Sequence, residues 1–358
     1  MSFERSNIHA MQGYVPGEQP DEGDVIKLNT NENPYPAPPA VASVLSTIKV
    51  EDLRRYPPPT ALDFRRAAAR LHGLGPENVI PTNGGDELLR LAITTFANPG
   101  ESVGIAVPGY SLYPVLTEIQ ACKLVSVPLD ESWHLPADFA EQLNAAKARL
   151  AMLVNPHAPS GILTPVSRIA EIAGKFKGVL LVDEAYVDFV DADQHHDLVP
   201  LLRQYPNLLL LRTLSKGYSL AGLRFAYGLG CADLIAPIMF KTRDSYNTDL
   251  IAQRLATAAI NAAADASKSW DKVRSERQSL CRELEKLQLT VIPSQSNFVL
   301  VTFARQHDAK SIYLALKQRR ILVRYFDQER LRDKLRISIG TAEQNRLLLQ
   351  NLREIMLL

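Results

Sequence analysis

The chain contains 358 residues, and its 40 Lys and Arg side chains balance 39 Asp and Glu side chains to a formal net charge of +1. Because the chain has no excess of basic residues to neutralise a phosphate backbone, nucleic-acid binding is excluded as its main function. The hydrophobic fraction of 46% and the charged fraction of 22% are typical of a folded globular protein and exclude a disordered chain.

The cysteines and the apolar runs limit the cellular setting. Cys122, Cys231 and Cys281 lie far apart and form no CxxC pair, so we expect neither a disulfide framework nor a metal site. The first residues carry charges and lack the apolar core of a secretory signal. No apolar run approaches the roughly 20 residues that a membrane span requires. The sequence therefore predicts a cytoplasmic protein with no membrane or nucleic-acid partner.

Residues 1–35 differ in composition from the rest of the chain. They are rich in Pro, Asn, Gly and acidic residues and show little periodicity. We interpret them as an N-terminal arm that packs over another surface, because the stretch NTNENPYP combines an aromatic residue with turn-forming asparagines.

Between residues 36 and 255, short apolar runs alternate with longer amphipathic stretches. This alternation predicts a large domain with a mostly parallel sheet covered by helices. The predicted strands are Ser102–Pro108, Lys123–Pro128, Leu150–Val154, Val179–Val182 and Leu208–Leu211. The predicted helices are Ala61–Leu71, Glu87–Phe96, Tyr113–Gln120, Ala137–Ala146 and Val166–Phe176. Ligands of such sheets bind beyond the carboxyl ends of the strands.

Residues 256–358 are predicted to form a smaller α/β domain. Ile251–Leu287 is Ala-rich and charged, and its helical periodicity indicates one long or broken helix that leads away from the large domain. The strands predicted after it are Leu289–Val291, Asn297–Thr302, Ile321–Arg324 and Leu335–Ile339. The predicted helices of this part are Ala309–Arg319 and Ala342–Met356.

The strongest chemical signal is the sequence TLSKGYSLAGLR, which directly follows the apolar strand Leu208–Leu211. Its lysine, Lys216, is expected to be desolvated, and a desolvated lysine has a depressed pKa and forms Schiff bases with carbonyl compounds. Ser215 and Arg224 can both donate hydrogen bonds to a phosphate. This combination predicts a site for pyridoxal 5'-phosphate.

Two further strand ends carry polar residues that suit the same cofactor. Asp183 follows Val179–Val182, and a carboxylate there keeps a pyridine nitrogen protonated, so that the ring accepts electrons. Tyr186 and Asn155 can donate hydrogen bonds to the ring oxygen. The alternatives are that Asp183 only caps the following helix and that the loop after Asn155 is only a turn.

A glycine-rich turn and an aromatic residue complete the candidate site. The turn TNGGDE precedes a helical pattern, so its backbone N–H groups and the positive end of the helix dipole can hold a phosphate. It does not match the dinucleotide-binding pattern GxGxxG. Tyr110 lies just beyond a predicted strand and can stack on a planar ring, and a core tyrosine is the alternative.

These motifs form an ordered set: NENPYP, RYP, NGGDE, PGYSLY, NPHAPSG, DEAY, TLSKGYSLAGLR and LRISIGT. The set resembles the class II pyridoxal-phosphate-dependent aminotransferases of fold type I, from about Tyr14 to the C-terminus. Within them it is most similar to the histidinol-phosphate aminotransferases. The resemblance implies their α/β fold, with a large cofactor-binding domain, a smaller C-terminal domain and a homodimer.

The resemblance also implies roles for the residues around the cofactor. Lys216 carries the cofactor as a Schiff base and later moves a proton, and Asp183 contacts the pyridine nitrogen. Asn155 and Tyr186 contact the ring oxygen, and Tyr110 stacks on the ring. The implied phosphate ligands are the backbone of Gly85 and Asp86, the side chains of Ser215 and Arg224, and Tyr56 of the other subunit.

Four residues are implied on the substrate side. Arg336 matches the arginine that clamps the substrate α-carboxylate or its equivalent. Arg324 matches the arginine that binds the substrate phosphate, and a surface arginine at a strand end is the alternative. Tyr14 matches an arm tyrosine that closes over this phosphate, from its own or the partner subunit. Glu32 is a further candidate for a substrate contact.

The sequence departs from the family pattern at a few positions. NPHAPSG stands where the family has NPNNPTG, and the asparagine expected to contact the cofactor is retained. Gly85 replaces a serine, which removes a hydroxyl donor and keeps the backbone N–H. Gly217 and Ser219 replace the usual small residue and glycine after the lysine. These departures bear on substrate preference and leave the expected fold unchanged.

The implied activity is transamination between histidinol phosphate and 2-oxoglutarate, which gives imidazole-acetol phosphate and glutamate in histidine biosynthesis. Three alternatives stay open: an aromatic amino acid aminotransferase, a pyridoxal-phosphate-dependent decarboxylase of an amino-acid phosphate, and a cofactor-binding regulator without turnover. Arg324 and Tyr14 argue against the aromatic aminotransferase only if they bind a phosphate.

Overall fold

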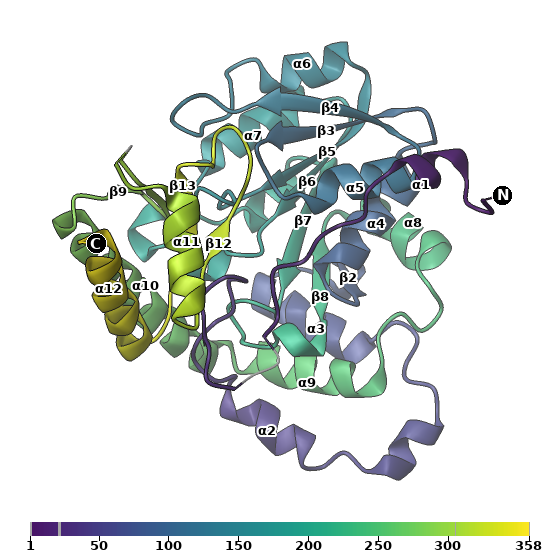
Figure 1. Ribbon diagram of the computed structural model, residues 1–358. Coiled ribbons are helices and arrows are strands. Elements are labelled where there is room, and N and C mark those ends of the chain that lie inside the picture. The colour runs from purple at the N-terminus through teal and green to yellow at the C-terminus, as the bar shows by residue number, and fades with distance from the viewer. Residues whose placement is uncertain (1, 21–22, 305, 358) are drawn as a thin grey trace.

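The computed structural model describes residues 2–20, 23–304 and 306–357. A large twisted sheet with helices on both faces occupies one side of the molecule, and a smaller sheet with its own helices lies beside it (Figure 1). The N-terminal segment runs across the front between these two parts. In the described parts of the chain, no helix combines the length and apolarity that crossing a bilayer would demand.

Within the described residues, the larger sheet has the strand order β2-β8-β7-β6-β5-β3-β4. Of these strands, β8 runs antiparallel to its neighbours β2 and β7, and the other pairs are parallel, as the prediction of a mostly parallel sheet requires. The strands are β2 (Val79–Thr82), β3 (Ser102–Val107), β4 (Lys123–Pro128), β5 (Ala148–Val154), β6 (Val179–Asp183), β7 (Leu208–Thr213) and β8 (Ala226–Leu229).

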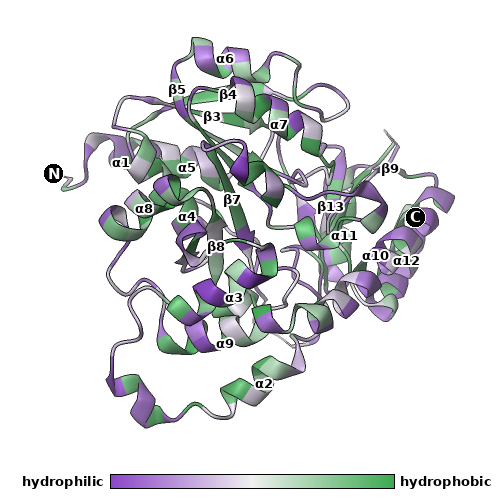
Figure 2. Cartoon of the chain, turned by 180° about the vertical axis from the view of Figure 1, so that it is seen from behind, coloured by the Kyte–Doolittle hydropathy of each residue, from purple (hydrophilic) through white to green (hydrophobic). Residues whose placement is uncertain are grey.

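Helices cover both faces of this sheet, because its strands are apolar on both sides. In β7, Leu208 and Leu210 belong to one hydrophobic cluster, and Leu209 and Leu211 belong to the cluster on the opposite face. Figure 2 shows apolar strands at the centre and polar outer faces on the helices. The helices of this part are α2 (Pro39–Leu45), α3 (Leu62–His72), α4 (Gly85–Phe96), α5 (Leu112–Ile119), α6 (Phe139–Ala145), α7 (Val166–Lys175), α8 (Ala232–Pro237) and α9 (Leu250–Asn261).

The predicted helix over 251–287 is broken at Ala262, which separates α9 from α10 (Ala263–Lys286). Beyond it lies an antiparallel sheet with the order β12-β13-β10-β9. Its strands are β9 (Thr290–Ile292), β10 (Phe298–Thr302), β12 (Arg324–Tyr325) and β13 (Lys334–Ser338). Helices α11 (Ala309–Gln318) and α12 (Ala342–Met356) complete this part and agree with the prediction to within one residue.

The N-terminal segment joins the two parts. Helix α1 (Ser6–Ala10) lies near the end of α5, where Asn7 donates to the carbonyl of Glu118. Further on, β1 (Ile26–Lys27) pairs in parallel with β11 (Ile321–Leu322), so the single strand predicted at 321–324 is divided between β11 and β12. We propose domain boundaries near residues 36 and 256. Strand β1 belongs to the N-terminal arm, and its partner β11 belongs to the small domain.

Candidate active site

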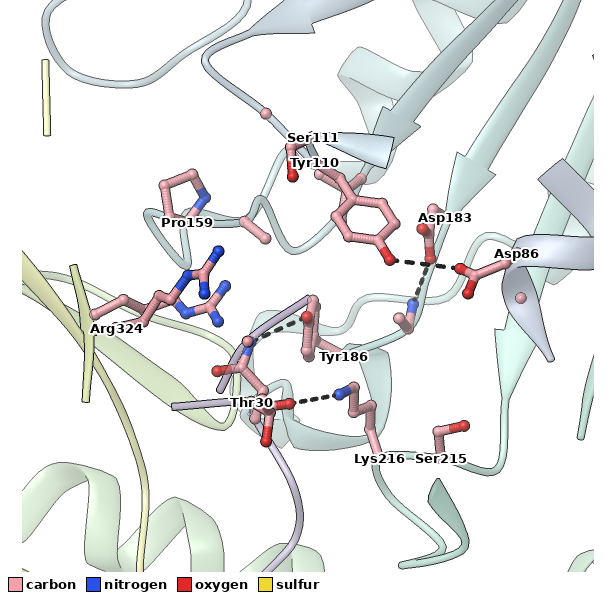
Figure 3. A pocket seen from close by; sticks show the side chains of 18 of the residues that line it. Thr30, Asp86, Tyr110, Ser111, Pro159, Asp183, Tyr186, Ser215, Lys216 and Arg324 are labelled. Atoms are coloured by element: carbon pink, nitrogen blue, oxygen red, sulfur yellow. Dashed lines mark hydrogen bonds between the residues drawn. The ribbon is translucent and has the colours of Figure 1, made fainter. Parts of the chain in front are cut away.

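A cavity of about 250 Å³ lies beyond the carboxyl ends of the central strands of the large sheet, and β12, β13 and the N-terminal arm line its other side (Figure 3). The parallel strands bring their ends to one edge, so residues from five separate motifs meet there. The predicted site residues that line the cavity are Tyr14, Gly85, Asp86, Tyr110, Asp183, Tyr186, Ser215, Lys216, Arg224, Arg324 and Arg336.

Lys216 lies in the loop after β7 and points into the cavity (Figure 3). Its Nζ donates a hydrogen bond to the carbonyl oxygen of Thr30 at 2.9 Å and lies 5.9 Å from the centre of the Tyr186 ring. Burial, together with the nearby charge of Arg336, lowers the pKa of Lys216 to about 8. A substantial fraction of this amine is therefore neutral near pH 7.5, as a nucleophile requires.

Asp183 ends β6 and is 5% exposed. The hydroxyl of Tyr113 donates to its Oδ2 at 3.0 Å, and the N–H of Ala185 donates to its Oδ1 at 3.1 Å. Burial outweighs these hydrogen bonds and raises the pKa of Asp183 to about 6. Sequence reasoning missed Tyr113, although its place three residues after Tyr110 at the start of α5 was a usable signal.

Tyr186 projects into the cavity from the segment after β6 (Figure 3). Asn31 donates from its Nδ2 to the Tyr186 hydroxyl oxygen at 3.0 Å, and the Tyr186 ring meets Phe298 edge-on with centroids 5.0 Å apart. Asn31 is buried and also lines the cavity, and sequence reasoning missed it. It directly precedes Glu32 in the NENPYP motif, and Glu32 was the residue of this motif that the sequence predicted to contact the substrate.

The glycine-rich turn and the lysine loop meet at the other end of the cavity. Gly85 and Asp86 form the first turn of α4, whose N–H groups have no partners within the helix. Arg224 approaches Asp86 with Nη2 3.7 Å from Oδ2, and the Tyr110 hydroxyl donates to Asp86 Oδ1 at 3.4 Å. With the hydroxyl of Ser215, these groups can surround a phosphate.

Arg324 and Arg336 stand directly opposite each other on β12 and β13 and both line the cavity. Arg336 Nη2 donates to the carbonyl of Asn29 at 3.0 Å, and neither arginine forms an ion pair with any residue that the structure describes. Burial, with a contribution from the charge of Arg324, lowers the pKa of Arg336. Like charges placed opposite each other repel, so this pair favours binding of an anion between them.

Three predicted site residues do not line the cavity. Glu32 pairs with Lys27, and Tyr56 is 80% exposed and stacks on Tyr246 with ring centroids 4.5 Å apart. Asn155 lies in the loop after β5. Its amide donates to the carbonyl of residue 164 at 3.1 Å and accepts from the N–H of the same residue at 2.8 Å. The cofactor and substrate contacts expected of these residues stay predictions.

His157, one of the departures from the family pattern, connects two loops at the cavity edge. The carbonyl oxygen of Pro108 can only accept a hydrogen bond, so the His157 Nε2 that lies 2.9 Å from it is the protonated nitrogen and donates. The other ring nitrogen, Nδ1, therefore accepts from the hydroxyl of Ser160 at 2.7 Å. Burial lowers the pKa of His157 to about 4 and keeps the ring neutral at physiological pH. The histidine thus anchors the loop that carries Tyr110.

The residues present fit pyridoxal phosphate. Asp183 is a buried carboxylate without a cationic partner among the described residues, as a protonated pyridine nitrogen needs. Within the described parts of the chain, Thr30 Oγ1 and Arg336 Nε are buried at the cavity wall without hydrogen-bond partners, so polar groups of a ligand can satisfy them. Lys216 lies beside these groups, and the free N–H groups at the start of α4 lie at the opposite end of the cavity.

Comparisons with known proteins agree with this geometry. Residues 23–352 match the family described as aminotransferase class I and II. The chain is 44% identical over 356 residues to histidinol-phosphate aminotransferase 1 of Nostoc sp. (strain PCC 7120), covering 99% of this chain and 98% of that protein. It is 42% identical over 341 residues to the histidinol-phosphate aminotransferase of Syntrophotalea carbinolica, covering 95% of each.

A solved structure shows the same architecture. The crystal structure of histidinol-phosphate aminotransferase from Sinorhizobium meliloti in complex with pyridoxal-5'-phosphate superimposes with a TM-score of 0.90 at 25% identity, covering 99% of this chain and 98% of that chain. Family match, relatives and architecture agree with the cavity chemistry, and the chain belongs to the class I and II aminotransferases.

Proposed function

We propose that the chain transfers an amino group between histidinol phosphate and 2-oxoglutarate, with pyridoxal 5'-phosphate as cofactor, and so serves histidine biosynthesis. The products are imidazole-acetol phosphate and glutamate. One observation carries the proposal: a desolvated lysine, a buried carboxylate and two opposed arginines line a single cavity. The relatives named above support the choice of substrate.

When bound, pyridoxal phosphate supplies an aldehyde that condenses with amines and a protonated ring that accepts electrons. Asp183 holds the proton on the ring nitrogen, and Tyr113 and the N–H of Ala185 keep its carboxylate in place. Tyr110 covers one side of the cavity and orients a planar group by stacking. Gly85, Asp86, Ser215 and Arg224 form the end that holds the cofactor phosphate.

Lys216 acts as the base. Its Nζ takes a proton from the substrate carbon that bears the amino group and returns a proton in the reverse half-reaction. The pKa of about 8 leaves the amine close to the working pH, where it can both accept and donate. Because each substrate reacts and leaves before the next one enters, the kinetics are ping-pong.

The two arginines divide the anionic groups of the substrates. Arg324 and the arm residue Tyr14 bind the phosphate of histidinol phosphate, and Arg336 binds the α-carboxylate of glutamate. The arm packs close to this place, since a Cβ at Gly17 would lie 3.7 Å from Arg324 Nη1. The bidentate guanidinium matches a phosphate or a carboxylate better than an ammonium does.

A homodimer is part of this proposal. Tyr56 does not line its own cavity and belongs to the stretch between α2 and α3. This stretch and α2 project from the large domain (Figure 1). Large apolar side chains are exposed on the same segment and near it, namely Leu45, Val50, Leu53, Tyr56 and Tyr246. Apolar side chains gathered in this way mark a protein interface, and a second copy there would bring Tyr56 to the partner's cofactor phosphate.

A cytoplasmic location completes the proposal. It is supported by Cys122, Cys231 and Cys281, which are all free thiols in the structure. A reducing compartment keeps such thiols unpaired.

The decisive experiment is a substrate panel on the purified, cofactor-loaded protein. Histidinol phosphate, phenylalanine and threonine phosphate are offered separately, and each half-reaction is followed by the loss of the visible absorption of the bound cofactor. We expect the fastest reaction with histidinol phosphate and no release of carbon dioxide from any substrate. Faster reaction of phenylalanine, or carbon dioxide from threonine phosphate, contradicts the proposal.

A substitution at Arg324 sharpens the panel. Arg324→Met removes the charge and keeps the length, so kcat/KM for histidinol phosphate is expected to fall about 100-fold, as loss of a hydrogen-bonded charge contact predicts. The half-reaction with glutamate is expected to change far less. Arg332→Met is the matched control, because Arg332 is an exposed arginine that pairs with Asp327 outside the cavity.

A further inference from the structure

Five consecutive residues, Asn29–Asn33, lie between the small sheet and the loops that carry the reactive side chains. The carbonyl of Asn29 accepts a hydrogen bond from Arg336 Nη2 at 3.0 Å, and the carbonyl of Thr30 accepts one from Lys216 Nζ at 2.9 Å. The last side chain of the segment donates to the carbonyl of Gly217 at 3.2 Å. We call this segment the seam, because it contacts both sides of the cavity.

Asn31 occupies the centre of the seam. It is 1% exposed and has a left-handed backbone with φ of +57°, which asparagine tolerates better than most residues. Its Oδ1 accepts from the hydroxyl of Ser338 at 3.0 Å, and its Nδ2 donates to the Tyr186 hydroxyl oxygen at 3.0 Å. Its N–H donates to Ser338 Oγ at 2.9 Å, and its carbonyl accepts from Asn297 at 2.9 Å. The side chain is therefore held from several directions.

This geometry determines what the Tyr186 hydroxyl can do. A phenol hydroxyl has one proton to give and oxygen lone pairs to accept with. Since its oxygen accepts from Asn31, its own proton remains available for a partner in the cavity. The edge-on contact with Phe298 fixes the ring that carries the hydroxyl.

We propose that Asn31 is a positioning residue, which holds the Tyr186 hydroxyl as a hydrogen-bond donor toward the ring oxygen of the bound cofactor. Through Ser338 it links that hydroxyl to β13, the strand that also carries Arg336 two residues earlier. The inference rests on the proposed contact between Tyr186 and the cofactor and does not depend on which substrate the enzyme takes.

The charged and titratable groups around Tyr186 come from several elements. Arg336 on β13, Asp183 on β6 and Tyr14 of the arm all influence the pKa of Tyr186, and Lys216 lies over its ring. None of these groups is altered by a substitution at Asn31. The effect of such a substitution on Tyr186 can therefore be separated from the effects of these charged and titratable groups.

The test uses Asn31→Gly, which keeps the positive φ without strain and removes the amide. The measured quantity is the midpoint pH of the visible absorption change of the cofactor-loaded protein without substrate. In the loaded protein, the ring oxygen of the cofactor and the Lys216 nitrogen that carries the cofactor share one proton. A hydrogen bond donated to the ring oxygen stabilises the anionic form of that oxygen, so the shared proton is lost at a lower pH. Loss of the oriented donor is therefore expected to raise the midpoint by about one pH unit.

A double-mutant cycle with Tyr186→Phe shows whether the effect passes through the tyrosine. In the Phe background, Asn31→Gly is expected to leave the midpoint unchanged. An equal shift in both backgrounds, or no shift in either, overturns the inference. Asn33→Ser is the control within the seam, since Asn33 contacts Gly217 and Ser269 and not Tyr186, and its midpoint is expected to match the wild type.

A second variant keeps the inference testable if Asn31→Gly unfolds. Asn31→Asp has the same shape and only accepts, so it turns the Tyr186 proton away from the cavity and is expected to raise the midpoint as well. An unchanged midpoint in Asn31→Asp overturns the inference. A wild-type protein that forms no visible band with pyridoxal phosphate overturns the proposed function itself, and an unchanged midpoint beside a normal band overturns only the role of Asn31.

Discussion

At the scale of single residues, burial sets the protonation of the two groups that the reaction needs. Desolvation disfavours the charged form of any group, so it lowers the pKa of Lys216 to about 8 and raises that of Asp183 to about 6. Burial thus moves both pKa values toward neutral pH before ligands arrive. The positively charged ring nitrogen of the cofactor would offset the desolvation cost of the Asp183 carboxylate, because it supplies the cationic partner that this carboxylate lacks.

The first prediction concerns the stability of the cofactor-free protein. The folded pKa of Asp183, about 6, lies above the ordinary value of 3.8, so the folded state binds the proton more tightly than the unfolded state. The resulting stabilisation is complete below about pH 4 and is lost as the pH rises through 6. Asp183→Asn should therefore raise the free energy of unfolding by up to about 3 kcal/mol at pH 8, and by about half as much at pH 5.

Urea denaturation of the cofactor-free wild type and Asp183→Asn at pH 5 and pH 8 measures this difference. The same variant is expected to lose transaminase activity, since asparagine cannot keep the ring nitrogen protonated. A variant that is less stable than the wild type at pH 8 would show that the buried carboxylate carries no such cost.

At the scale of elements, the turn between β2 and α4 shapes the phosphate end of the cavity. Gly84 has φ of +78°, and a Cβ there would lie 2.7 Å from Arg224 Nη2. The turn therefore needs a glycine for two reasons: its backbone is strained for other residues, and the arginine occupies the space of a side chain.

The second prediction follows from this packing. Gly84→Ala should displace Arg224 and weaken the binding of pyridoxal phosphate about tenfold, as loss of a charge-assisted hydrogen bond implies. The control is Gly100→Ala, where φ is +87° but no atom lies within 4 Å of the added Cβ. It carries similar backbone strain without touching an arginine. Cofactor titration of the apoproteins compares them, and equal affinities for the two variants would contradict the role of Arg224.

At the scale of the whole molecule, the cavity is lined from both domains, and Tyr56 remains outside it. The opposed Arg324 and Arg336 come from the small sheet, and Lys216 and Asp183 come from the large one. A single chain thus supplies most of the proposed site, and in the proposed dimer the second chain would contribute Tyr56. This division can be tested by mixing subunits.

The third prediction is complementation between two defective variants. A mixed dimer of Lys216→Ala and Tyr56→Ala contains one cavity with both an intact Lys216 and an intact Tyr56 from the neighbouring chain. Refolding the two variants together should give activity well above the sum of the two parents, measured at limiting pyridoxal phosphate.

The control for this mixture is Arg224→Met with Lys216→Ala. Arg224 lies beside Asp86 of its own chain, so no cavity of that mixed dimer is complete and no recovery is expected. Recovery in the control, or its absence in the Tyr56 mixture, would argue against an exchange of Tyr56 between subunits.

The sequence by itself determined the fold class, and most of the site residues predicted from it line the cavity, because both depend on local patterns. Buried parallel strands are continuous apolar runs, and their carboxyl ends gather at one edge, so the polar residues after each run were expected to meet. The two strands of the large sheet that escaped prediction, β2 and β8, have four residues each and contain Pro81 and Gly228, which weaken a strand signal.

Only the tertiary structure decided which partners hold the reactive groups. Asn31 bonds to Tyr186 and to Ser338, which are 155 and 307 positions away, and Tyr113 bonds to Asp183 from 70 positions away. The pairing of β1 with β11 likewise joins the arm to the far end of the chain. Such contacts leave no periodicity in the sequence, because they are selected by the packing of two domains around a single cavity.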